Sequence, residues 1–228
     1  MSKVSTNGFI LKVVAIVTMV IDHLTAAFEL ALPENIYHIG RSIGRTSFPL
    51  FAYMIAVGYM HTRDKKNYLL RLVGVGIISE VLFDYLLFDR FYVPSYNNIF
   101  FTLALGLLAL IIIEYVREVI KNKYLGEILE LVVPVLLGFV AEYCHTDYGF
   151  YGVFLIYTFY IYLRSKDKIT LLLPMIFGIT QTPYVLPAYV LIYLDDGTHG
   201  RHLSKYITYL FYPAHILVAI LLRGLVGL

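Results

Sequence analysis

Asp22 and His23 are two ionisable side chains inside an apolar stretch that covers residues 9–32. Ionisable groups at membrane depth cost roughly 2.5 kcal/mol or more each, so by default they indicate a functional site. An imidazole takes up and returns protons near neutral pH, and we therefore expect His23 to handle a proton. Neighbouring helical positions point about 100° apart. Asp22 therefore need not orient His23, and it is free to pair with an arginine.

Arg41 and Arg45 are four residues apart, just before a second apolar stretch. This spacing places both on one helix face, where they could bind a phosphate, a carboxylate or Asp84. A structural ion pair and a ligand contact both remain open. His215 follows Tyr212 and Pro213 in the last apolar stretch. A site role and a structural role in a helix kinked by the proline are equally open for it.

Three further polar residues lie in or beside apolar stretches. Glu80 and Asp84 are four residues apart, and Asn98 precedes the next stretch. We expect the two acids to be structural partners of Arg71, Arg41 or Arg45, with all three residues supporting the site.

Several kinds of site are not expected. The histidines form no HxxxH or HExxH pair, so we predict no metal. The chain has no GxxxxGK[ST], GxGxxG or GxSxG motif, which argues against a P-loop, a Rossmann site and a serine hydrolase. The net charge of +2 gives no reason to expect nucleic acid, and the single cysteine, Cys144, excludes an intramolecular disulfide.

The elements that must position these residues are membrane helices. The chain has 228 residues, of which 59% are hydrophobic and 15% charged, and its mean hydropathy is +0.74. A spanning helix needs about 20 apolar residues, so we predict an all-α polytopic membrane protein with one domain over residues 1–228. Nine stretches are candidates for helices: 9–32, 47–60, 68–88, 99–116, 128–143, 150–163, 169–180, 184–194 and 206–222. The seventh and eighth are short, which is typical of broken or re-entrant segments.

Positive charge alternates between the connections. Clusters of Lys and Arg lie in 63–66, 117–123, 164–168 and 201–205, whereas the intervening loops hold only Arg90. The positive-inside rule then predicts a cytoplasmic N-terminus, about nine transmembrane or partly re-entrant helices and an external C-terminus. Arg41 and Arg45 would lie on the external side against this rule, and we therefore expect them to have buried partners.

Segments along nearly the whole chain resemble the TraX family, the F-pilin acetylation proteins. They include Met19-Val20-Ile21-Asp22-His23, Gly44-Arg45-Thr46-Ser47-Phe48-Pro49, Ile78-Ser79-Glu80, Asp147-Tyr148-Gly149 and Phe211-Tyr212-Pro213-Ala214-His215, in the family's order. Thr46-Ser47 is more polar than the family pattern leads us to expect. Relatives include the wider group of transmembrane acyltransferases.

The resemblance implies an acetyltransferase of the bacterial inner membrane. Such an enzyme would move an acetyl group from cytoplasmic acetyl-CoA to an external hydroxyl or amine, on a pilin N-terminus or an envelope glycan or polymer. The resemblance implies that His23 is the base and that Arg45 is a functional residue. It extends, in second place, to Asp22, Arg41, Glu80 and His215.

The donor's phosphates would be bound by basic residues near the cytoplasmic face. The candidates are Arg63, Lys65, Lys66, Arg71, Arg201 and Lys205. Whether the protein forms a homodimer stays open. The alternative functions are a proton-coupled transporter, which also uses buried Asp, His and Arg groups, and a structural assembly factor.

Overall fold

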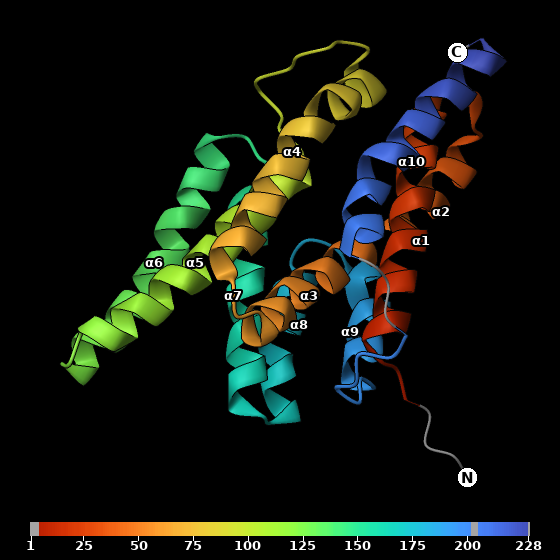
Figure 1. Cartoon of the computed structure of the whole chain (residues 1–228). Helices are drawn as coiled ribbons and strands as arrows, with labels where there is room; N and C mark the ends of the chain where they lie inside the picture. The colour runs from red at the N-terminus through yellow and green to blue at the C-terminus, as the bar shows by residue number, and fades with distance from the viewer. Residues whose placement is uncertain (1–4, 202–204, 228) are drawn as a thin grey trace.

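The computed structural model describes residues 5–201 and 205–227, with the side chains of 205–207 left out of the description. The described residues form helices and no strand, and so confirm the all-α prediction. The helices are α1 (Gly8–Ala27), α2 (Glu34–Gly44), α3 (Ser47–His61), α4 (Lys65–Phe88), α5 (Ile99–Val119), α6 (Lys123–Tyr143), α7 (Gly149–Ser165), α8 (Leu172–Ile179), α9 (Leu186–Tyr193) and α10 (Lys205–Val226) (Figure 1). Three 3₁₀ turns are η1 (Glu29–Ala31), η2 (Lys168–Leu171) and η3 (Pro183–Val185).

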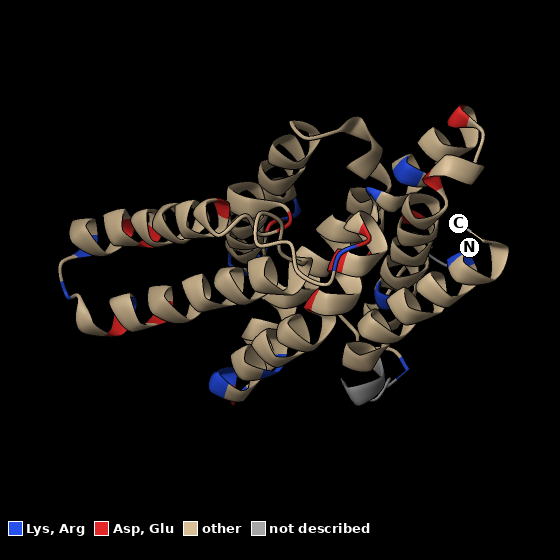
Figure 2. Cartoon of the chain, turned by 90° about the horizontal axis from the view of Figure 1, so that it is seen from above, with Lys and Arg blue, Asp and Glu red and all other residues tan. Residues whose placement is uncertain are grey.

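Each of the nine predicted apolar stretches coincides with a helix, and α2 is an additional one. Among the described residues, four helical segments are long and apolar enough to cross a bilayer: Gly8–Ala27, Ile99–Val119, Lys123–Tyr143 and Thr208–Val226. Large apolar side chains of α6 point outward, and Phe139 is 61% exposed. Such a surface is typical of a site that contacts a membrane or another protein. Figure 2 shows the charged residues mostly near helix ends and in connections, as expected of a helical membrane protein.

Helices α2 and α3 form one interrupted element. After α2 ends at Gly44, the backbone bends at Arg45 and Thr46, and α3 begins at Ser47. Glycines allow α2 to lie against α1, because a Cβ at Gly44 would come within 2.2 Å of a carboxylate oxygen of Asp22. Gly40 is equally close to Thr25. The Gly40-x-x-x-Gly44 spacing is the small-residue pattern that brings membrane helices into close contact.

Helices α8 and α9 form a short hairpin. With their 3₁₀ turns they cover Lys168–Ile179 and Pro183–Tyr193, each roughly 20 Å long against about 30 Å of bilayer core. The Tyr189 hydroxyl donates to the Pro174 carbonyl at 2.8 Å, and Lys168 donates to the Tyr193 carbonyl at 2.8 Å. These bonds hold the two helices of the hairpin side by side, at its base and part-way along. Its tip reaches the interrupted element, where the Thr46 hydroxyl donates to the Tyr184 carbonyl at 3.4 Å.

Two loops are joined at the other end of the bundle. Residues 89–98, between α4 and α5, pair with the turn 144–148, between α6 and α7, through an isolated parallel bridge of Asn97 and Thr146. The Asn97 amide donates to the His145 carbonyl at 2.8 Å, and the Asp147 amide donates to the Asn97 carbonyl at 2.7 Å. This bridge fixes the backbone of Asp147 relative to α5.

Candidate functional site

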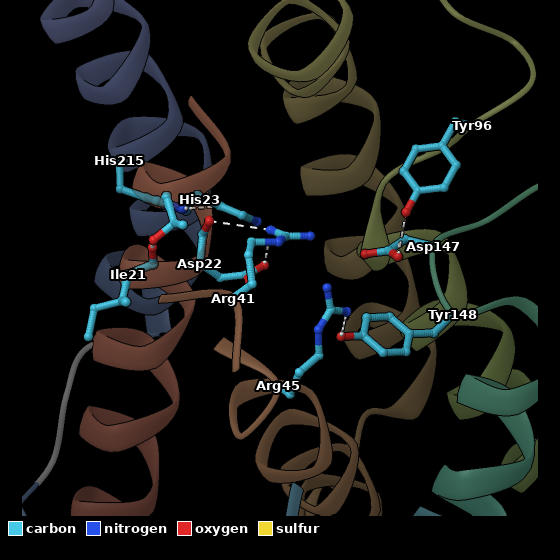
Figure 3. A network of polar contacts seen from close by, with 10 residues as sticks. Ile21, Asp22, His23, Arg41, Arg45, Tyr96, Asp147, Tyr148 and His215 are labelled. Atoms are coloured by element: carbon cyan, nitrogen blue, oxygen red, sulfur yellow. Dashed lines mark hydrogen bonds and ion pairs between the residues drawn. The ribbon is translucent and has the colours of Figure 1, made fainter. Parts of the chain in front are cut away.

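A cavity of about 150 Å³ lies where α1, the α2–α3 interruption, α10 and the two joined loops meet. Its polar lining residues are Asp22, His23, Arg41, Arg45, Ser47, Tyr96, Asp147, Tyr148 and Tyr212. Figure 3 shows Arg41 and Arg45 between the histidines on one side and Tyr96, Asp147 and Tyr148 on the other. The structure therefore brings four of the five predicted catalytic residues into one cavity wall, and the fifth, His215, lies directly behind His23.

His23 and His215 form a hydrogen-bonded pair. Nδ1 of His23 lies 2.7 Å from Nε2 of His215, and the ring planes differ by 6° with centroids 4.9 Å apart. A centroid separation much larger than the N···N distance places nearly parallel rings edge to edge. This is the geometry of an in-plane N–H···N bond.

The backbone fixes the protons of this pair. Nδ1 of His215 lies 2.9 Å from the Phe211 carbonyl oxygen, which only accepts, so Nδ1 carries a proton. In neutral His215, Nε2 is then an acceptor, and Nδ1 of His23 must donate to it. The remaining nitrogen, Nε2 of His23, carries the lone pair. It makes no hydrogen bond with the described residues, and it is free to accept a proton.

Asp22 pairs with Arg41, as the adjacent-position argument allowed. Nη1 of Arg41 lies 2.9 Å from Oδ2 of Asp22, and Nη1 also donates to the Asp22 carbonyl at 3.3 Å. Arg41 therefore has the partner that was predicted for it, and the side chain of this partner is half-buried, at 19% exposed. The other carboxylate oxygen of Asp22 is buried and makes no hydrogen bond with the described residues.

Arg45 reaches the cavity from the interruption between α2 and α3. Its Nη1 donates to the Tyr148 hydroxyl at 3.4 Å. Within residues 5–201 and 205–227, no carboxylate lies within 4.0 Å of its guanidinium. The partner of Arg45 is thus the hydroxyl of Tyr148 and not a carboxylate. The positive charge of Arg45 remains available to an oxyanion in the cavity.

Asp147 faces these arginines from the joined loops. Its Oδ1 accepts from the Tyr96 hydroxyl at 2.9 Å, and the Thr102 hydroxyl donates to its backbone carbonyl. Burial raises the pKa of Asp147 from 3.8 to about 6, against the opposing effects of the Tyr96 hydrogen bond and of Arg45. The cavity therefore holds two arginines and two carboxylic acids, of which only Asp22 and Arg41 form an ion pair.

The predicted ion pairs of Glu80 and Asp84 are wrong for the described part of the chain. Glu80 accepts from the side chain of Asn98, and Asp84 accepts from the Val93 amide at 2.7 Å. None of these three predicted supporting residues lines the cavity. Because the two acids point toward the start of α5 and the preceding loop, they hold the loop that carries Tyr96.

The five predicted donor-binding residues whose side chains the structure describes lie away from the cavity lining. Lys65 pairs with Glu114, and Arg71 lies over the rings of Tyr68 and Tyr209. Arg63, Lys66 and Arg201 are exposed. The side chain of Lys205 is outside the described part of the structure.

The prediction did not select four aromatic or acidic cavity residues: Tyr96, Asp147, Tyr148 and Tyr212. Asp147 and Tyr148 belong to the Asp-Tyr-Gly segment that begins α7, and an acid at the end of an apolar stretch was a usable signal. Tyr212 is 3% exposed, and its hydroxyl has no hydrogen-bond partner among the described residues. The usable signal for Tyr212 was its place in the Phe211-Tyr212-Pro213-Ala214-His215 segment, three residues before His215.

Fold and site together define a helical membrane protein with a buried histidine pair facing an arginine-lined cavity. The chain matches the TraX protein family over residues 7–223 and belongs to that family. It is similar to the probable fimbrial assembly protein FimC, serogroup H1, of Dichelobacter nodosus, with 32% identity over 92% of this chain and 93% of the relative. No solved structure matches the chain.

Proposed function

We propose that this protein is an acetyltransferase embedded in the bacterial cytoplasmic membrane, which uses acetyl-CoA and acts in pilus assembly. The observation that carries the proposal is the free Nε2 of His23, with its tautomer set by His215, in the same cavity as the guanidinium of Arg45. A base beside a fixed positive charge is what acyl transfer requires. Family membership and the fimbrial assembly relative support this function.

In the proposed reaction, an acceptor hydroxyl or amine attacks the thioester carbonyl. Nε2 of His23 takes the acceptor's proton as the new C–O or C–N bond forms. The C–S bond then breaks, and the CoA thiolate leaves and takes up that proton. Arg45 stabilises the negative charge that develops on the carbonyl oxygen. Asp22 holds Arg41 in place, and His215 holds the ring of His23.

The donor's phosphates would be bound outside the cavity. Arg63, Lys66 and Arg201 remain the candidates with exposed charge, whereas Lys65 and Arg71 already have partners in the structure. Phosphates bind readily to such solvent-facing cations.

The test is thiol release from acetyl-CoA by the purified protein in detergent, with a peptide carrying a free amine and serine hydroxyls as the acceptor. We expect the wild type to release CoA, and His23→Ala to lose this activity by at least about 100-fold while unfolding at a similar temperature. Release of CoA at the wild-type rate by folded His23→Ala would contradict the mechanism.

A proton-coupled transporter is the second candidate. The interrupted α2–α3 element and the short α8–α9 hairpin meet inside the bundle, an arrangement typical of transporter sites. The same assay separates the two functions, because a transporter releases no thiol from acetyl-CoA.

A further inference from the structure

Tyr212 brings a buried phenol hydroxyl to the cavity that holds His23 and Arg45. Its side chain lines this cavity, and the residue is 3% exposed. The hydroxyl has no hydrogen-bond partner among the described residues. Burying a polar group in this way costs free energy, and native structures keep few such groups. A hydroxyl of this kind beside a candidate active site points to a partner that arrives with the substrate.

The other hydroxyls that line the cavity already have partners. The Ser47 hydroxyl donates to a backbone carbonyl of α1 at 3.0 Å, and the Tyr96 hydroxyl donates to a carboxylate at 2.9 Å. The Tyr148 hydroxyl accepts from Arg45 at 3.4 Å. Tyr212 is thus the cavity hydroxyl whose donor and acceptor are both uncommitted among the described residues.

Three neighbouring rings fix the ring of Tyr212. It meets His23 edge-on, with centroids 5.7 Å apart and planes 77° apart. It also packs against Phe100 at 4.9 Å and against His215 at 5.5 Å, again nearly perpendicular. These contacts hold the phenol beside the base without any contribution from its hydroxyl. The group is therefore preorganised, as stabilisation of a developing charge requires.

The hydroxyl lies within electrostatic reach of both sides of the cavity. The groups that act on it most strongly are Asp147, Glu80, Tyr96 and Asp22. Except for Glu80 they line the cavity, Asp22 from α1 and the other two from the joined loops. A carboxylate offers only acceptors to an anionic oxygen. A phenol ordinarily loses its proton only near about pH 10, so Tyr212 can donate a hydrogen bond there at neutral pH.

We propose that Tyr212 is a further catalytic residue, whose hydroxyl donates a hydrogen bond to the carbonyl oxygen of the donor thioester as that oxygen becomes negative. This role rests on the acetyltransferase function proposed above. Negative charge gathers on the oxygen as the acceptor bonds to the carbonyl carbon, and it leaves the oxygen as the C–S bond breaks. Tyr212 keeps its own proton throughout. Arg45 supplies the positive charge and Tyr212 a directed O–H donor. Because the hydroxyl is unpartnered beforehand, its hydrogen bond forms where it lowers the barrier.

Tyr212→Phe tests this role, since it removes the hydroxyl and keeps the ring contacts. We expect kcat for thiol release from acetyl-CoA to fall about 100-fold, with nearly unchanged KM values for acetyl-CoA and for the acceptor peptide. The unfolding temperature should equal or exceed that of the wild type, because the hydroxyl has no partner to lose. The pH profile of kcat should keep its shape, because His23 is unchanged.

Tyr189→Phe is the matched control. Tyr189 is 2% exposed and lies outside the cavity, and its hydroxyl donates to the Pro174 carbonyl at 2.8 Å. This variant should unfold at a lower temperature than the wild type and keep its kcat. The two tyrosine variants are therefore expected to show opposite patterns of stability and activity.

Wild-type kcat in folded Tyr212→Phe would overturn the proposal. A lower unfolding temperature with wild-type kcat would do the same, since it would show a structural hydrogen bond. A raised KM for the acceptor with unchanged kcat would place the hydroxyl on the acceptor, and a shifted pH profile would show that it acts through His23; either result also refutes the assigned role. Failure of the proposed function looks different, because the wild type itself would then release no thiol from acetyl-CoA.

Discussion

At the scale of single residues, the pairing of His23 with His215 determines which nitrogen can act as a base. The lone pair is on Nε2 of His23. The Phe211 carbonyl determines this through two successive hydrogen bonds, one from His215 to the carbonyl and one from His23 to His215. In this account His215 is a positioning residue, since it does not line the cavity. Its contribution is a hydrogen-bond acceptor at the position of Nε2.

This role predicts a difference between two replacements of His215. Gln can place its carbonyl oxygen near the position of Nε2 and keep accepting from His23, whereas Leu cannot. We expect His215→Gln to keep kcat within about tenfold of the wild type and His215→Leu to lose about 100-fold, both with an unchanged KM for acetyl-CoA. Equal kcat values for the Gln and Leu variants would show that hydrogen-bond acceptance by residue 215 is irrelevant.

Asp147 predicts how stability depends on pH. Burial raises its folded-state pKa to about 6, so the folded protein keeps a proton that the unfolded chain loses nearer pH 4. Stability should therefore fall as pH rises from 4 to 6, by at most about 3 kcal/mol from this group. Asp147→Asn removes the titration.

Thermal unfolding in detergent at pH 4.5 and pH 7.5 checks this prediction. From pH 4.5 to pH 7.5, the unfolding temperature of the wild type should fall by more than that of Asp147→Asn. A smaller loss for the wild type than for the variant would reverse the sign and refute the assigned protonation.

At the scale of elements, the contact between α1 and α2 places both arginines. Gly44 leaves no room for a side chain, because a Cβ there would lie within 2.5 Å of three side-chain atoms of Asp22. Any displacement of α2 would also move Arg41 and the start of α3. The interrupted element therefore depends on a glycine at this position.

Gly44→Ala should destabilise the protein by about 1–3 kcal/mol through overpacking, and it should lower kcat because Arg41 and Arg45 shift. Gly74→Ala in α4 is the matched control, since no described atom beyond the adjoining backbone of its own helix lies within 4 Å of its Cβ position. Alanine favours a helix over glycine by up to about 1 kcal/mol, so this variant should unfold at the same temperature or higher. Thermal unfolding measures the stability of the two variants, and thiol release measures their kcat. Equal unfolding temperatures and equal kcat values for the two variants would contradict close packing at Gly44.

At the scale of the whole molecule, the sequence predicts the helices well. Where water is absent, the backbone of an apolar stretch must make its hydrogen bonds within a helix. Asp22, His23, Arg41 and Arg45 were also predictable, since charge inside apolar sequence is costly and therefore informative. The pairing of His23 with His215 was not, because it joins residues 192 positions apart and depends on how α10 packs against α1. The roles of Glu80 and Asp84 were mistaken because their spacing shows a shared face but no partner.

The contact between the interrupted element and the hairpin is a feature that no local sequence pattern reveals. An interrupted element and a short hairpin, separated by more than 100 residues, meet at Thr46 and Tyr184. They meet next to Arg45, which lies in the interruption and lines the cavity.

Transfer of a labelled acetyl group into sealed vesicles tests this account most directly. Purified protein is reconstituted into proteoliposomes that contain a peptide with a free amine and serine hydroxyls, and acetyl-CoA labelled in its acetyl group is added outside. We expect labelled peptide inside and free CoA outside for the wild type, and neither for folded His23→Ala. Equal labelling by wild type and His23→Ala, or no labelling by the wild type in intact vesicles, would contradict it.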